Sequence, residues 1–240
     1  LSNDTDVIIV VLYYMHIFLR DGLKELWIKG GKGDTSRYIP VHVLYEKLGS
    51  ELCSVLPALH SLTGCDITSK VGTKKAAIQS NPVQFLSMFG KNPVLNETDI
   101  KMAEQFLSKV LKKTGTHENF NELRADLYNF SNDKSHWNLP PTSAALLPHI
   151  KRAFYNTYCQ THILESTFIS IDPLSYGFVM SESLLLPERC LNELSDQWTA
   201  KCRCVNCSRS TCACRSMGVK CVRFCGCMKR DECKNPFNID

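Results

Sequence analysis

The sequence lacks an apolar run long enough to cross a membrane. The longest, Val7–Met15, has nine residues, whereas a transmembrane helix needs roughly 20. Asp4 and Asp6 stand before this run, where a secretory signal peptide would carry basic residues. The chain has no internal repeat and no low-complexity segment. We therefore expect a folded chain outside the membrane, with one large or two small domains in its 240 residues. Because it begins with Leu1 rather than Met, we also expect it to be part of a longer protein or the product of a truncated gene prediction.

The C-terminal forty residues lack histidine and have few apolar side chains, yet they hold nine of the 13 cysteines. The nine are Cys202, Cys204, Cys207, Cys212, Cys214, Cys221, Cys225, Cys227 and Cys233. The other four are scattered over the first 200 residues. Such density without a secretory signal indicates bound metal in a reducing compartment rather than disulfides.

The number of cysteines in this tail fits a cluster of zinc ions. Zinc takes four tetrahedral ligands, so about three separate ions would need about twelve thiolates. Nine cysteines suffice if three of them each bridge two ions. Because the tail has too few apolar side chains for a core, the metal must supply its folding free energy.

Charge separates the tail from the rest of the chain. Residues 201–240 contain nine basic and three acidic side chains, a net +6, while the whole chain carries +4 and the first 200 residues therefore carry −2. Nine thiolates and three Zn²⁺ together contribute about −3, which leaves the metallated tail near +3. A compact positive module suits a phosphate backbone. The candidate phosphate contacts are Arg203, Arg209, Arg215, Lys220 and Arg223.

The tail resembles the tesmin-type CXC domain. The resemblance covers residues 201–236, from Cys202-Arg203-Cys204 through Cys225-Gly226-Cys227 to Cys233-Lys234-Asn235-Pro236. It implies a tri-zinc cluster, DNA binding partly through the minor groove, and a nuclear location. Tesmin-like proteins carry two such units; the chain has one, as in the male-specific-lethal type. Thr211 stands where tesmin has the tyrosine that enters the minor groove.

The first 81 residues show a mixed strand and helix pattern. Val7–Tyr14 is a β-branched and aromatic run typical of a strand buried on both faces. Leu26–Ile28 and Arg37–Ile39 are further strand candidates, and residues 41–48 and 52–62 have helical spacing. We expect an α/β domain with a mostly parallel sheet and helices over residues 1–81. Residues 82–164 are predicted to form an all-α segment, and residues 165–200 an irregular linker before the zinc-cluster module at 201–236.

Acidic residues in the first 81 residues carry a second resemblance. Asp4-Thr5-Asp6 is followed by Leu62-Thr63-Gly64-Cys65-Asp66 and then by Gly72-Thr73-Lys74-Lys75-Ala76. This order is similar to the C-terminal half of the flap-endonuclease (XPG) branch of PIN-like nucleases. The resemblance implies that Asp4, Asp6 and Asp66 bind Mg²⁺ or Mn²⁺. It also implies that Gly72, Lys74 and Lys75, in a helix–hairpin–helix, contact the DNA backbone. The family's other acids lie upstream of this segment, so we expect these 240 residues alone to be inactive.

Three hypotheses follow. The first is a zinc-dependent DNA-binding protein with an incomplete or degenerate nuclease-like domain. The second is a metal-dependent, structure-specific nuclease, a Mg²⁺ or Mn²⁺ phosphodiesterase, whose N-terminal half is missing. The third is a structural or protein-interaction module that zinc merely folds. We favour the first, with DNA as the partner. The whole chain also resembles uncharacterised animal proteins associated with mobile elements, through its acidic segment, Asn138–Thr142, Tyr176–Phe178 and the cysteine tail.

Overall fold

A computed structural model of the chain describes residues 4–31, 36–112, 119–130, 139–190, 202–221, 225–227 and 233–238. The chain divides into two compact units, one comprising Leu1–Gly115 and Leu146–Arg189, the other Thr116–Ala145 and Cys190–Asp240. The described residues are mostly helical, and their strands form only two antiparallel pairs. The predicted mostly parallel α/β sheet is therefore wrong for this part of the chain.

Helix α1, Thr5–Arg20, occupies the segment for which the sequence predicted the strand Val7–Tyr14. The Asp4 side chain caps the helix by accepting the backbone N–H of Asp6 at 2.9 Å. The positive charge of Arg20 in the last turn interacts favourably with the negative C-terminal end of the helix dipole. An apolar run alone is compatible with a buried strand or a helix, and the 16 residues that this element spans exceed the usual length of a strand. Leu12 and Met15 are buried among residues of α2 and α3.

A small hairpin and three helices follow α1. Strands β1 (Trp27–Gly30) and β2 (Arg37–Pro40) pair antiparallel, close to the two predicted short strands. Helix α2 (Val41–Leu48) ends at Gly49, whose φ of +81° suits glycine, and α3 follows at Ser50–Thr63. These two predicted helices are confirmed, and α4 (Lys74–Gln79) comes after a turn.

The predicted helical segment is also confirmed where it is described. It contains α5 (Pro82–Leu86), α6 (Glu97–Leu111), α7 (Phe120–Phe130) and α8 (Ser143–Thr161). A capping box begins α6, in which Asn96 and Asp99 each accept the other's backbone N–H. One face of α6 is buried, through Ala103, Phe106, Leu107 and Val110, which follow one another at helical spacing.

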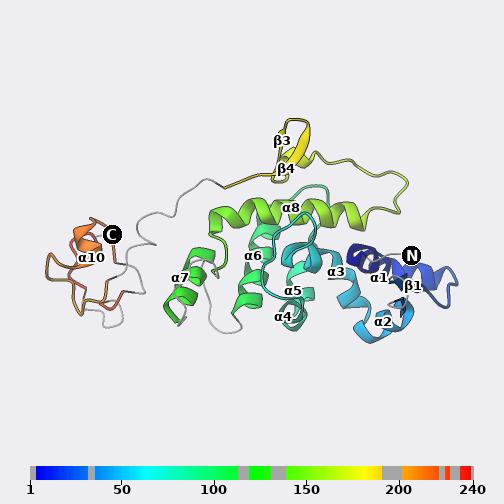
Figure 1. The fold of residues 1–240 in the computed structure, drawn as a ribbon, viewed down its shortest axis with the longest axis horizontal. Helices are drawn as coiled ribbons and strands as arrows, with labels where there is room; N and C mark the ends of the chain where they lie inside the picture. The colour runs from blue at the N-terminus through cyan, green and yellow to red at the C-terminus, as the bar shows by residue number, and fades with distance from the viewer. Residues whose placement is uncertain are drawn as a thin grey trace. The chain divides into compact units, whose positions relative to one another are not determined.

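Helix α8 forms hydrogen bonds with segments of the larger unit that are far apart in the sequence. It lies across α3 and α6 (Figure 1). The ring Nε2 of His149 pairs with the carbonyl of Leu62, at the end of α3, at 2.9 Å. Farther along, the hydroxyl of Thr161 donates to the carbonyl of Gly90 at 3.1 Å. The helix that carries these contacts falls within residues 82–164, which the sequence predicted to be all-α.

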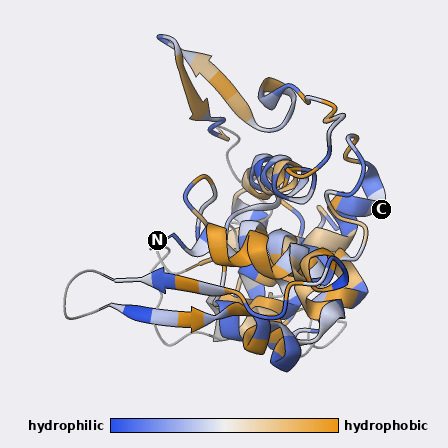
Figure 2. Ribbon diagram, turned by 90° about the vertical axis from the view of Figure 1, so that its right-hand side faces the viewer, coloured by the Kyte–Doolittle hydropathy of each residue, from blue (hydrophilic) through white to orange (hydrophobic). Residues whose placement is uncertain are grey.

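Residues 165–190 are not all irregular, contrary to the prediction. They contain a 3₁₀ turn, η3 (Pro173–Ser175), and a hairpin of β3 (Phe178–Ser181) and β4 (Leu184–Pro187). Both turn residues, Glu182 and Ser183, have positive φ. Asparagine and glycine usually fill such positions, so the sequence carried no hairpin signal here. The strands are hydrophobic (Figure 2), and all of β4 is exposed.

Candidate metal centre

The nine C-terminal cysteines come together in the second unit, in a segment that we call the cysteine module (residues 202–238). Seven are buried: Cys202, Cys207, Cys212, Cys214, Cys221, Cys225 and Cys227. Cys204 and Cys233 are partly buried against them. All 13 cysteines of the chain are free thiols. The core of this module is therefore made of thiol groups, in place of the aliphatic side chains of an ordinary core.

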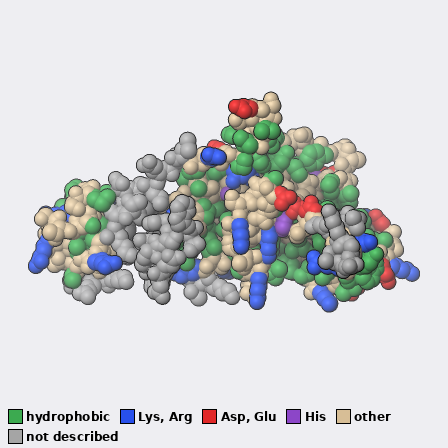
Figure 3. All heavy atoms as spheres, in the orientation of Figure 1, with side chains coloured by type: hydrophobic (Ala, Val, Ile, Leu, Met, Phe, Trp, Pro, Cys, Tyr) green, Lys and Arg blue, Asp and Glu red, His purple; other side chains and the backbone are tan. Residues whose placement is uncertain are grey.

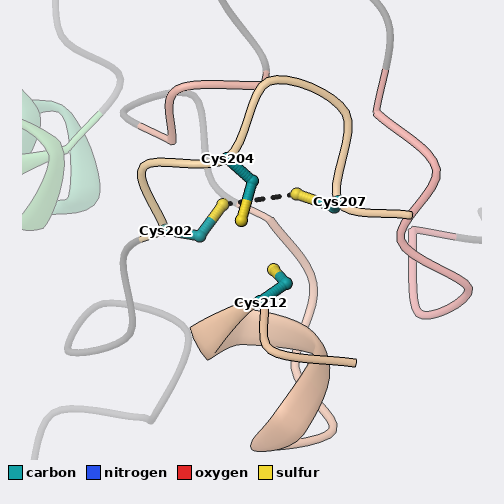
Figure 4. A group of neighbouring side chains, drawn as sticks. All are labelled: Cys202, Cys204, Cys207 and Cys212. Carbon is teal, nitrogen blue, oxygen red and sulfur yellow. Dashed lines mark hydrogen bonds between the residues drawn. The ribbon is translucent and has the colours of Figure 1, made fainter. Parts of the chain in front are cut away.

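The distances between sulfur atoms match those of a tetrahedral metal site. The Sγ atom of Cys202 lies 3.3 Å from that of Cys207 and 3.8 Å from that of Cys227. Four sulfurs at about 2.3 Å from one zinc are about 3.8 Å from one another, whereas a disulfide bond is about 2.05 Å long. Figure 4 shows the side chains of Cys202, Cys204, Cys207 and Cys212 converging on one region.

Three sets of four cysteines each have all their sulfurs within 4.8 Å of one another. The sets are Cys202, Cys204, Cys207 and Cys212; Cys202, Cys214, Cys221 and Cys225; and Cys202, Cys207, Cys221 and Cys227. Cys202 belongs to all three sets, and Cys207 and Cys221 to two each, while Cys233 belongs to none. The cluster could hold zinc, and its sets share ligands.

Local backbone geometry brings these thiols together. Gly226 approaches the first cysteines closely, because its N–H donates to the carbonyl of Cys202 at 2.9 Å. A Cβ atom at Gly226 would lie only 2.9 Å from the carbonyl oxygen of Cys204. The short helix α10 (Ala213–Ser216) turns the chain between Cys212 and Cys221. Glycine at position 226 is therefore required for two distant cysteine pairs to meet.

Two asparagines that the sequence analysis did not single out support the cluster. The side-chain amide of Asn235 donates to the Cys221 sulfur, and that of Asn238 to the Cys233 sulfur, each at 3.2 Å. Asn235 also donates to the carbonyl of Val219 at 2.9 Å. Such donors stabilise thiolates and orient metal ligands. Asn235 stands in the segment Cys233–Pro236 that carries the CXC resemblance, whereas the only signal for Asn238 was its position five residues after the last cysteine.

Without metal, most thiols in the cluster are held in the protonated form. Burial raises the pKa of Cys214 to about 12 and that of Cys227 to about 11. Burial also raises the pKa of Cys202, but hydrogen bonds from its neighbours, beginning with Cys207, outweigh it and lower the value to about 6. A Cys202 thiolate, stabilised by hydrogen bonds from neighbouring thiols, would be the first ligand of an incoming metal ion. Binding of the metal by the other cysteines then releases their protons.

The predicted acidic site is arranged differently from a two-metal centre. Asp4 is the cap of α1, and Asp66 lies exposed in the turn after α3. Asp6 Oδ1 lies 2.6 Å from Nε2 of the buried His60, a residue the sequence analysis had not selected. Outside the cysteine module, the described residues contain no set of three potential ligand atoms within 4.8 Å of one another.

Gly72, Lys74 and Lys75, the three residues predicted to contact the DNA backbone from a helix–hairpin–helix, lie in different environments. Lys74 points inward, where its ammonium donates to the carbonyls of His60 and Gly64, at 2.7 Å each. Burial lowers the pKa of Lys74 to about 8, although Cys65 and Asp6 raise it. Gly72 has φ +71°, and a Cβ there would lie 2.5 Å from Val110, so close packing on α6 explains the glycine. Lys75 is exposed.

The predicted phosphate contacts of the cysteine module mostly face solvent. Arg203, Arg209 and Lys220 are exposed. Arg215 is half-buried, and its guanidinium donates to the carbonyl of Ser208 at 2.6 Å. Arg223 lies outside the described residues. Three of the predicted contacts are therefore exposed on a module whose core is made of thiols.

Comparison of the chain with protein-family models, with curated proteins and with solved structures finds no match. Within the described residues, no helix combines the length and the apolar character needed to span a membrane.

Proposed function

We propose that the chain is a zinc-dependent DNA-binding protein whose cysteine module holds about three Zn²⁺ ions. The observation that carries this proposal is the set of three overlapping groups of four cysteine sulfurs. Thiolate-only, four-coordinate zinc has no open position for water or substrate, so the metal acts structurally. Its task is to fold a module that has almost no other core.

Charge supports DNA as the partner of the folded module. Nine thiolates, about −9, and three Zn²⁺ ions, about +6, leave the cluster at about −3, against +6 on the basic and acidic side chains of residues 201–240. Arg203, Arg209 and Lys220 are exposed on this small module. A compact positive surface attracts a phosphate backbone without requiring a particular base sequence. A nuclear location is part of this proposal.

We do not propose nuclease activity for these residues. The carboxylate of Asp6 is engaged by His60, and the ammonium of Lys74 interacts electrostatically with Asp6. A cation already placed beside this carboxylate competes with a divalent metal ion. The described part of the first unit also has no parallel sheet to align further acids.

The zinc-loaded 240-residue chain is expected to bind a mixed-sequence DNA duplex, and excess chelator is expected to abolish the binding. Fluorescence anisotropy at several salt concentrations measures this affinity. Log affinity should fall linearly with log salt, because phosphate contacts release counterions. The double variant Arg209→Ala/Lys220→Ala should reduce the magnitude of the slope by roughly 2, since each lost contact removes about 0.9.

Lys24→Ala is the matched control, because Lys24 is exposed but lies in the first unit. This variant should leave affinity and slope unchanged. Binding that survives the chelator would place the DNA site outside the cysteine module. Absence of binding by the zinc-loaded chain would leave zinc as a folding element only and refute the proposal.

A further inference from the structure

The hairpin of β1 and β2, in the first unit, carries two large aromatic side chains on its outer face. Side chains alternate between the two faces of a strand, and Ile28 packs against the buried residues of α1, α2 and α3. Trp27 therefore lies on the opposite face, together with Lys29 and its cross-strand partner Tyr38. Trp27 is 51% exposed and Tyr38 is 62% exposed. Two exposed rings on one face of a strand pair indicate a surface that contacts another molecule.

Neighbouring side chains hold the ring of Trp27 in place. It meets the ring of His42 edge-on, with 5.4 Å between the ring centres. Its Nε1 donates to the carboxylate of Glu25 at 3.0 Å. The backbone beside it is also fixed, because the N–H of Val41 donates to the carbonyl of Leu26 at 2.9 Å. A ring that is already ordered loses little conformational entropy when it makes a contact.

Basic side chains lie beside the two rings. The ammonium of Lys29 is 5.7 Å from the centre of the Tyr38 ring, across the strand pair. Arg37 precedes Tyr38 and is exposed. Figure 3 shows basic side chains next to hydrophobic ones in the region where Figure 1 places β1. The outer face thus combines rings that can stack on flat apolar groups with cations that attract a polyanion.

The spacing of the rings suits an extended strand of nucleotides. Tyr38 lies opposite Lys29, two residues along from Trp27, so the rings are diagonal neighbours in the strand pair. Such neighbours are about 7–8 Å apart, more than the roughly 3.4 Å between stacked bases. Each ring can therefore stack on a separate base.

We propose that the outer face of β1 and β2 is a second nucleic-acid site, which binds a single strand and not a duplex. Trp27 and Tyr38 stack on the bases, and Lys29 and Arg37 contact the phosphates. The base faces are open in a single strand, and stacking on them tolerates any sequence. A proline-rich peptide also docks on aromatic rings, but it offers no charged partner to Lys29 and Arg37. The inference does not depend on DNA binding by the cysteine module.

Fluorescence anisotropy of the zinc-loaded full chain with a labelled oligothymidylate of roughly 10 nucleotides tests this inference. Trp27→Ala and Tyr38→Ala should each weaken this binding by about 5- to 100-fold, the range for loss of aromatic–base stacking, and should leave duplex affinity unchanged. Phe168→Ala is the control, because Phe168 is 43% exposed in the same unit and should have no effect. The double variant Lys29→Ala/Arg37→Ala should reduce the magnitude of the salt slope by about 1.4, since each contact to a single strand contributes about 0.7.

Two further arms separate this site from the cysteine module and identify the strand. Excess chelator should leave the oligothymidylate bound, because β1 and β2 belong to the first unit. An oligouridylate of the same length distinguishes RNA from DNA as the source of the strand, and tighter binding of either supports the inference. Binding of the single strand that chelator abolishes would overturn it.

The fluorescence of the unaltered chain gives a measurement that does not depend on how the alanine variants fold. The chain has three tryptophans, and stacking on a base should quench the one at Trp27. Trp27→Phe should retain the affinity, because it keeps an aromatic ring, and should lose this quenching. Fluorescence that the strand leaves unchanged would overturn the inference, as would unchanged single-strand affinity in Trp27→Ala and Tyr38→Ala. Binding of a polyproline peptide in place of both oligonucleotides would also overturn it. None of these outcomes affects duplex binding by the zinc-loaded module, so the two proposals fail separately.

Discussion

Replacing Cys202 by serine is expected to remove at least two zinc ions from the cysteine module. Cys202 belongs to all three sets of four sulfurs, so its loss breaks every candidate site. Serine is a poor substitute, because its hydroxyl does not ionise at neutral pH as a zinc-binding thiol does. Each structural zinc contributes roughly 10–16 kcal/mol of apparent binding free energy, and this is also folding free energy. The variant module should therefore be largely unfolded.

Cys204→Ser is the matched comparison, because Cys204 belongs to a single set. It should cost at most one zinc ion. Cys190→Ser should cost none, since Cys190 belongs to no set. Native mass spectrometry of the three variants gives the counts directly. If Cys202→Ser and Cys204→Ser lost the same number of ions, Cys202 would not be a shared ligand and the overlapping arrangement would be wrong.

Phe154→Ala is expected to destabilise the first unit by about 3–5 kcal/mol, the usual cost of emptying a large aromatic site in a core. Phe154 is fully buried on α8. Its ring meets Phe89 edge-on at 5.4 Å and stacks on Tyr176 at 5.6 Å. Tyr176 in turn donates its hydroxyl to the carbonyl of Pro93 at 2.6 Å. The cavity would therefore loosen α8, the segment before α6 and the segment that leads to β3.

Urea unfolding of the zinc-loaded chain, followed by circular dichroism, measures this loss. Phe168→Ala is the control, because Phe168 is 43% exposed and its removal should cost less than about 1 kcal/mol. The zinc count of Phe154→Ala should not change, since the cysteine module belongs to the other unit. A loss below about 1 kcal/mol for Phe154→Ala would contradict the assignment of this ring to the core.

Helices with regular apolar spacing could be predicted from the sequence: α2 and α3 lie close to their predicted positions, and α6 and α8 fall within the segment predicted to be all-α. The run in α1 could not be assigned reliably, because nine consecutive apolar residues have neither helical nor strand periodicity. Predicting a strand in place of this helix also led to a wrong expectation for the positions of the Asp4 and Asp6 side chains. In a strand, Asp4 and Asp6 would share a face, but in the structure Asp4 caps the helix and Asp6 meets His60.

The cysteine cluster was the more predictable feature, because closely spaced thiols on a short chain have little freedom to separate. Eight of the nine predicted cysteines fall in the three sets of sulfurs. The hydrogen bonds of the supporting asparagines could not be predicted, because they depend on how the last turn folds back over Cys221. Likewise His60 lies 54 residues from Asp6 in the chain, beyond the reach of any local pattern.

The central claim is that one short module holds a shared-ligand zinc cluster, and the zinc content of the intact chain tests it most directly. Elemental analysis and native mass spectrometry of the reduced, zinc-loaded protein should give about three zinc ions per chain, bound together rather than in independent steps. One zinc ion per chain, held by a single set of four cysteines, would contradict the account.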